Sequence, residues 1–267
     1  MPDKPCVFAV AAHPDDIEFM MSGTMMLLRE RGWDLHYMNI ANGSCGTAVD
    51  PPEVIVPKRR AEAVDACELI GATFHESICN DLEVYYTYEQ VAQVLAVVRR
   101  IKPTIMLVQS PQDYMEEHQN ATRLAVTAAF CRGMRNYTSA PPVAPIEGDV
   151  TIYHALPYGL RDPMRRRIRP GQYVDVSTVI QEKRDMLACH RSQKEWLDKS
   201  QGLDAYLDTM QEFAEDVGEM SGRFELAEGW RRRSHLGFSA ADSDPLHEAL
   251  GDLCLIDDAY EEDLDRA

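Results

Sequence analysis

The sequence predicts an α/β fold of the Rossmann-like, doubly wound type, with a mostly parallel sheet and helices on both faces. Short apolar runs typical of buried strands alternate with longer stretches of helical periodicity over the first two-thirds of the 267 residues. This order favours parallel strands joined by crossover helices. After Ser177 the pattern turns helical to about residue 215, with a break near Gly202, which predicts a C-terminal helical extension.

The first part of the sheet is predicted from alternating strands and helices. Strands are expected at 5–11, 35–40 and 73–78, and helices at 17–31, 58–70 and 89–101. Gly32 and Gly71 end the first two helices, because glycine readily adopts the left-handed conformation found at helix C-termini. A Pro-rich linker, with prolines at 51, 52 and 57, precedes the second helix.

The later elements complete a single domain. We expect a strand at 104–109, a helix at 117–132, and strands at 150–155 and 173–176. One domain over residues 1–241, including the C-terminal helices, is followed by a tail over residues 242–267. The tail carries ten acidic side chains and one arginine, which is typical of a solvated segment. Four leucines are expected to hold it partly to the domain: Leu246, Leu250, Leu253 and Leu255.

Composition favours a cytoplasmic protein that acts on a small molecule. Hydrophobic residues make up 45% and charged residues 27%, which is typical of globular proteins. The formal net charge of −17 argues against nucleic acid or an anionic membrane as the main partner. We find no apolar run long enough to span a bilayer and no secretion signal at the N-terminus. The seven cysteines show no paired spacing and are expected to be reduced.

The segment His13-Pro14-Asp15-Asp16 directly follows the first predicted strand. Open α/β sheets bind ligands at the carboxyl ends of their strands. His13 and Asp16 are spaced so that both side chains can reach one metal ion at a strand-to-helix turn, which leaves Asp15 free to act as a general base. The alternative is that Asp15 or Asp16 caps the following helix and His13 only packs.

A third ligand is expected from another strand end. His118 opens the helix after the strand at 104–109, so it lies at the same edge of the sheet as His13. Two histidines and one carboxylate fit Zn²⁺ best, and Fe²⁺ is possible with the same ligands.

These motifs resemble the LmbE/PIG-L family of zinc-dependent de-N-acetylases, which act on molecules that contain N-acetylglucosamine. The similarity spans about residues 5–195. It rests on these ordered motifs: 12–18 with Ser22-Gly23-Thr24, 59–63 with 69–71, Asn80-Asp81, 113–118, and 174–177 with Lys183, Leu187 and 190–193.

The resemblance implies a function and a role for each matching residue. It implies zinc ligands at His13, Asp16 and His118, with Asp15 as general base. It implies that Arg59 holds the substrate and that Asp81 lies near the sugar. The expected reaction is hydrolysis of the N-acetyl group of an amino sugar or glycoconjugate by zinc-activated water. Members of the family often assemble into multimers, so a homo-oligomer is possible.

One position departs from the family pattern. Met115 stands where many members have a histidine that assists at the oxyanion or the leaving group, and a thioether cannot donate a proton. Tyr114, His154 and His190 are candidate replacements, and we prefer His154 because it ends a predicted strand. The alternative function is a zinc- and sugar-binding homologue that has lost turnover.

Two other features of the sequence allow a different interpretation. The arginine-rich segment 161–169 could bind an anionic group of the substrate, but pairing with the acidic tail or with a neighbouring subunit is favoured. A nucleotide-binding module is disfavoured, because the first strand-to-helix turn lacks the Gly-x-Gly-x-x-Gly pattern.

Overall fold

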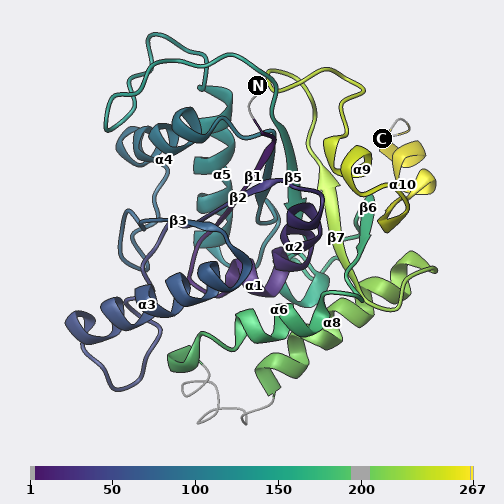
Figure 1. Ribbon diagram of the computed structural model, residues 1–267, viewed down its shortest axis with the longest axis horizontal. Coiled ribbons are helices and arrows are strands. Elements are labelled where there is room, and N and C mark those ends of the chain that lie inside the picture. The colour runs from purple at the N-terminus through teal and green to yellow at the C-terminus, as the bar shows by residue number, and fades with distance from the viewer. Residues whose placement is uncertain (1–3, 194–204, 265, 267) are drawn as a thin grey trace.

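An eight-stranded sheet with the strand order β3-β2-β1-β4-β5-β7-β6-β8 forms the centre of the molecule (Figure 1). The computed structural model describes residues 4–193, 205–264 and 266. The strands are β1 (Cys6–Ala11), β2 (Asp34–Asn39), β3 (Thr73–His75), β4 (Ile105–Val108), β5 (Thr151–Ala155), β6 (Gln172–Asp175), β7 (Ala227–Arg232) and β8 (Cys254–Ile256). The first five pair in parallel, whereas β7 is antiparallel to β5 and β6, and β8 is antiparallel to β6. The predicted mostly parallel sheet is confirmed.

Helices cover both faces of the sheet, also as predicted. One face packs against α1 (Asp16–Met20), α2 (Ser22–Glu30), α3 (Pro52–Ile70), α6 (Ile180–Leu187), α8 (Ala205–Ser221) and α9 (Pro245–Leu250). The other face packs against α4 (Tyr88–Ile101) and α5 (Glu116–Phe130). Strand β1 is buried on both sides: Val7 and Ala9 face the first helix layer, and Phe8 and Val10 face the second. This explains why β1 is a continuous apolar run rather than an alternating one.

The strand order places a topological switch point beside β1. Strand β1 pairs with β2 on one side and with β4 on the other, both in parallel. The chain therefore builds the sheet outward in one direction through β3, and in the opposite direction from β4 through β5. Ligand sites of open α/β sheets lie in the crevice at the carboxyl ends of such strands.

Two helix predictions need correction. The helix expected over 17–31 is divided at Met21, which ends α1 and begins α2 with φ −134° and ψ −20°. The Pro-rich linker is wrong, because α3 already begins at Pro52 and continues through Pro57. Proline is well suited to the first helical position, since its missing N–H would have no partner there.

The C-terminal third contains more sheet than the sequence predicts. Helices α6 and α8 confirm the helical extension, and the break expected near Gly202 lies outside the described residues. Strand β7 follows them and inserts between β5 and β6, with Trp230 fully buried in the core.

Residues after Asp242 also belong to this part of the sheet. They form α9, β8 and α10 (Asp258–Leu264), and β8 pairs with β6 at the edge of the sheet. Leu246 and Leu250 are buried. The proposed division at residue 241 stays a prediction. No helix in the described part of the chain is both long and apolar enough to cross a membrane.

Candidate metal centre

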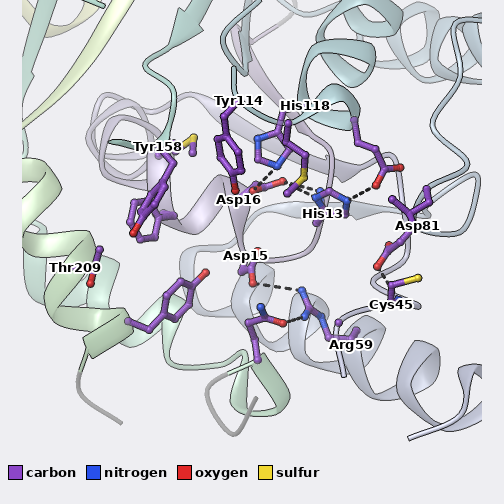
Figure 2. Close-up of a pocket in the computed structure, with 18 residues that line it drawn as sticks. His13, Asp15, Asp16, Cys45, Arg59, Asp81, Tyr114, His118, Tyr158 and Thr209 are labelled. Atoms are coloured by element: carbon purple, nitrogen blue, oxygen red, sulfur yellow. Dashed lines mark hydrogen bonds and ion pairs between the residues drawn. The ribbon is translucent and has the colours of Figure 1, made fainter. Parts of the chain in front are cut away.

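Three potential metal ligands converge at the carboxyl edge of the sheet (Figure 2). His13 follows β1, Asp16 begins α1, and His118 lies in the first turn of α5. One ligand atom from each residue lies within 4.8 Å of the other two. Asp16 lies between the imidazoles, with Oδ2 3.4 Å from His13 Nδ1 and Oδ1 3.4 Å from His118 Nε2. The structure thus brings together the three residues expected to be ligands.

A second carboxylate faces the outer nitrogen of each imidazole. Glu117 Oε2 lies 3.0 Å from His13 Nε2, and Asp113 Oδ1 lies 3.0 Å from His118 Nδ1. Such partners fix the orientation and tautomer of a ligating histidine, so that its other nitrogen is presented to the metal. No role was expected for Glu117 or Asp113 from the sequence. The one feature of the sequence that could have indicated them is that both lie within five residues of His118.

The charges of the cluster are strongly coupled. Burial lowers the pKa of His13, but hydrogen bonds to Asp16 and Glu117 outweigh burial and raise it to about 10. Burial also opposes protonation of His118, whereas Asp16 and Asp113 raise its pKa. The pKa of Asp16 is lowered, because the attraction of His118 and His13 exceeds the effect of burial. Binding of a divalent cation would displace protons from the two imidazoles.

The side chains of His13, Asp16 and His118 provide the ligand atoms that Zn²⁺ or Fe²⁺ requires. Two imidazole nitrogens and one carboxylate oxygen, all largely shielded from solvent, leave open positions for water and substrate. This set suits catalytic Zn²⁺, and the same combination of two histidines and one carboxylate also binds Fe²⁺.

Asp15 lies in the turn that connects β1 to α1 and lines the same cavity as the cluster. Its backbone has φ 98°, in the left-handed region that non-glycine residues rarely adopt. The turn is held by Asp16 N, which donates to His13 O, and by Phe19 N, which donates to Asp15 O. Asp15 is the N-cap residue of α1 but makes no side-chain capping hydrogen bond, so the capping interpretation is wrong for this residue.

The carboxylate of Asp15 lies against Arg59. Arg59 Nη2 is 3.3 Å from Asp15 Oδ2, and the same nitrogen donates to the carbonyl of Pro14. Burial raises the pKa of Asp15 to about 6, although the Arg59 guanidinium opposes this effect.

A cavity of about 480 Å³ opens beside these groups. The cavity is lined by the three candidate metal ligands and by Asp15, the candidate general base. Residues from the loops after β2, β3 and β4 and from α8 complete the lining. The lining residues are His13, Asp15, Asp16, Phe19, Met20, Cys45, Gly46, Arg59, Asp81, Leu82, Tyr114, Met115, Glu117, His118, Tyr158, Gln193, Tyr206 and Thr209.

Arg59 and Asp81, the expected substrate-binding residues, both line this cavity but already have protein partners. Arg59 is 2% exposed and donates to Gln193 Oε1 as well as to Pro14 O. The two carboxylate oxygens of Asp81 accept from Gly43 N at 2.7 Å and from Cys45 N at 2.8 Å. Asp81 therefore shapes the loop after β2.

Of the three candidates to replace the missing histidine at Met115, the structure brings only Tyr114 to the cavity. His154 is buried at the end of β5, with Nδ1 3.0 Å from the carbonyl of Gln109, and it does not line the cavity. His190 is also buried, with Nε2 2.7 Å from Glu18 Oε1. The position of His154 at a strand end was predicted, but its side chain is used inside the fold.

The arginine-rich segment 161–169 does not reach the cavity. None of its arginines is among the lining residues. Arg169 lies 3.2 Å from Asp257, so pairing with the acidic C-terminal segment is confirmed for this arginine.

Comparison with known proteins supports the family resemblance. Residues 8–130 match the PIG-L family, described as GlcNAc-PI de-N-acetylase. This domain match confirms the resemblance seen in the sequence. It is 27% identical over 198 residues to a diacetylchitobiose deacetylase of Thermococcus kodakarensis, an alignment that covers 70% of this chain and 69% of the relative.

Two other similar proteins, a hydratase and a deacetylase, have different activities. A 4-oxalmesaconate hydratase of Pseudomonas putida is 24% identical over 193 residues, covering 69% of this chain and 72% of the relative. The solved N,N'-diacetylchitobiose deacetylase of Pyrococcus horikoshii superposes with a TM-score of 0.75 at 21% identity, covering 91% of this chain and 89% of that one. At this identity the superposition shows that the fold is shared.

Proposed function

We propose that this chain is a metal-dependent de-N-acetylase that hydrolyses the acetamide of an N-acetylated amino sugar or glycoconjugate. The observation that carries the proposal is the cluster of His13, Asp16 and His118, with ligand atoms within 4.8 Å, in the same cavity as Asp15. The PIG-L match and the deacetylase relative support the reaction class. Zinc is the proposed metal, and Fe²⁺ is the alternative for the same ligands.

In this proposal His13, Asp16 and His118 would hold the metal, which when bound lowers the pKa of a water molecule and polarises the acetamide carbonyl. Asp15 is the general base that takes the proton from the attacking water. It then returns this proton to the nitrogen of the departing amine, which leaves acetate and a free amino sugar. Arg59 holds the Asp15 carboxylate in place through the contact at 3.3 Å.

Tyr114 is the residue proposed to replace the missing histidine. It lines the cavity next to Met115, and its ring centroid lies 5.8 Å from that of His118. A phenolic hydroxyl can donate a hydrogen bond to a developing oxyanion, whereas a thioether cannot. His154, expected from the sequence, would need to leave its buried position to do so.

The first test is metal analysis of the purified chain, followed by measurement of amine release from N-acetylglucosamine and N,N'-diacetylchitobiose. About one zinc per chain and release of the amine are expected. Asp15→Asn is expected to keep the metal and to lose about 10²- to 10⁴-fold in kcat, because a neutral amide cannot accept the proton. Loss of the metal from this variant would show that Asp15 is a ligand and not the base.

Two alternatives give different results in the same assay. The zinc- and sugar-binding homologue without turnover, suggested by Met115, would bind metal and sugar and release no amine. A hydratase like the P. putida relative would act on a carboxylate substrate. Within the described lining, the only guanidinium is that of Arg59, whose contacts are already made within the protein, so the metal itself would have to bind the carboxylates of such a substrate. The cytoplasmic location and the homo-oligomer stay predictions.

A further inference from the structure

One wall of the cavity is aromatic from the metal centre to the rim. The ring of Tyr114 lies edge-on to His118, with centroids 5.8 Å apart. Tyr158 follows at 6.3 Å from Tyr114, and Phe19 lies 5.7 Å from Tyr158. Figure 2 shows Tyr114 and Tyr158 side by side on this wall, next to Asp16. We call Tyr114, Tyr158 and Phe19 the aromatic wall.

The two tyrosines of the aromatic wall are exposed, whereas Phe19 is buried. Phe19 is 4% exposed, whereas Tyr114 is 52% exposed and Tyr158 is 46% exposed. Phe19 supports Tyr158 from below through an edge-to-face contact at an interplanar angle of 67°. The wall is therefore a fixed platform whose two outer rings are open to a ligand rather than closed by the fold.

The charges of the described lining do not suit an anionic ligand beside this wall. Four acidic side chains line the cavity: Asp15, Asp16, Asp81 and Glu117. Arg59 is buried against Asp15, Pro14 and Gln193, so its charge is used within the protein. The four carboxylates carry one charge more than Arg59 and a divalent metal ion together, so the lining offers a phosphate or carboxylate on the platform no net attraction, whereas a neutral pyranose can place its apolar C–H face on an aromatic ring.

The cavity is large enough for more than the reacting sugar. Its volume of about 480 Å³ is within the range of pockets that enclose drug-sized ligands. If the acetamide lies at the metal centre, the next unit of the substrate extends along the aromatic wall toward the rim.

We propose that Tyr158, supported by Phe19 and continued by Tyr114, forms a subsite for a second, uncharged sugar ring attached to the N-acetylated one. This inference rests on the proposed function, because it places the reacting acetamide at the metal centre. It makes Tyr158 a specificity-determining residue: the ring selects substrates of two or more neutral sugars over a single sugar and over anionic conjugates. Tyr158 has no role in the chemical step.

The test compares the metal-loaded wild type with Tyr158→Ala on N-acetylglucosamine and N,N'-diacetylchitobiose. Loss of the ring face is expected to reduce kcat/KM for the disaccharide about tenfold, through KM, and to leave the monosaccharide unaffected. Tyr158→Phe keeps the ring and is expected to behave as wild type. Tyr158→Leu retains apolar contact with Phe19 and serves if Tyr158→Ala does not fold. Tyr85→Ala is the matched control, because Tyr85 is 57% exposed and does not line the cavity.

Calorimetric titration of the same two sugars separates this inference from the proposed function. Binding of the disaccharide that depends on Tyr158, without any amine release, would overturn the deacetylase proposal and support the subsite. Amine release with equal effects of Tyr158→Ala on both sugars would overturn the subsite and support the deacetylase. Higher kcat/KM for N-acetylglucosamine 6-phosphate than for the neutral disaccharide would also overturn the subsite. Neither binding nor release of either sugar would overturn both.

Discussion

At the scale of single residues, the proposed metal centre depends on carboxylates outside the three candidate ligands. Asp113 is fully buried, and its Oδ1 faces His118 Nδ1 at 3.0 Å. Asp113 also accepts a hydrogen bond from Met115 N, which begins the turn into α5. One side chain therefore sets both the helix start and the orientation of the ligating ring.

Asp113→Ala is expected to weaken zinc binding by about 10- to 100-fold, because His118 loses the partner that fixes its ring. Asp113→Asn keeps an acceptor oxygen and is expected to lose less. Competition with a chelator of known affinity measures both variants. Unchanged affinity in Asp113→Ala would mean that α5 alone orients His118.

His154, expected to be catalytic, is buried and does not line the cavity, so we propose that it affects stability instead. Burial lowers its pKa to about 4, the nearby Arg233 and Arg231 act in the same direction, and the hydrogen bond with Gln109 opposes them. The ring is thus neutral in the folded protein at pH 5, whereas an unfolded histidine with a pKa of about 6.5 binds a proton there. Stability from this group is complete above pH 6.5 and is lost as the pH falls toward 4.

We therefore expect His154 to contribute a loss of about 2 kcal/mol in the free energy of unfolding between pH 7 and pH 5. Urea unfolding at both pH values, in wild type and in His154→Asn, measures this contribution. The variant is expected to show the smaller pH dependence. His235→Asn is the control. An equal pH dependence in wild type and His154→Asn would contradict the buried neutral state.

The sequence predicted the three residues of the candidate metal cluster better than the carboxylates around them. His13, Asp16 and His118 could be found because each lies at or just beyond the end of a strand, and parallel strand ends share one edge of the sheet. The pairing of Glu117 with His13 joins residues 104 positions apart, so no local pattern reports it. No local pattern predicts the burial of His154 either, because its ring is enclosed by residues that follow β4 and β7.

At the scale of elements, α2 depends on a side chain from the other end of the chain. Glu228 of β7 is buried and accepts from Gly23 N and Thr24 N, both at 2.8 Å. These are free N–H groups of the first turn of α2, which need acceptors. Lys183 of α6 donates to the same carboxylate. A Cβ on Gly23 would lie 2.6 Å from Val176, so glycine permits this close approach.

Glu228→Ala is expected to destabilise the protein by about 3–5 kcal/mol, because it leaves Lys183 buried without a counter-charge and the start of α2 without acceptors. Urea unfolding monitored by circular dichroism measures the change. Glu182→Ala is the matched control, since it removes the ion pair with Arg29 that is about one-third exposed and joins the same two helices. That control is expected to cost at most about 1 kcal/mol. Equal effects of the two substitutions would contradict this account.

Elements with a strong local signal were the ones that the sequence predicted. Strands β1 and β4 are apolar runs buried on both faces, and α4 has a clear apolar stripe that begins after the Thr87 cap. Strand β7 was missed because its residues, Ala227–Arg232, are largely polar. Its carboxylate accepts from α2 and α6, Arg231 donates to the loop after β4, and Arg232 donates to the carbonyl of Ser243; all of these contacts exist only in the folded chain.

At the scale of the whole molecule, the segment after residue 241 completes one side of the fold. Asp244 accepts from Tyr153 OH at 2.7 Å and from Gln172, and it lies 3.3 Å from Arg232. It thereby ties together β5, β6 and β7. Strand β8 covers the edge of β6, which would otherwise expose unpaired backbone groups.

A chain that ends at residue 241 is therefore expected to lose more than about 3 kcal/mol of stability, because Leu246 and Leu250 leave the core and Tyr153 OH loses its acceptor. Removal of residues 258–267 alone is the matched control. It deletes α10, which has no buried residue, and keeps β8, so a near-wild-type unfolding midpoint is expected. Urea unfolding and light scattering of the three chains compare stability and association.

If the chain that ends at residue 241 were as stable as the full chain, residues 242–267 would be the solvated tail expected from their charge. If the shortened chain unfolds more readily and associates, residues 242–267 are part of the fold. Their acidic side chains then describe only the outer surface of this segment, whose strand β8 covers the edge of the sheet.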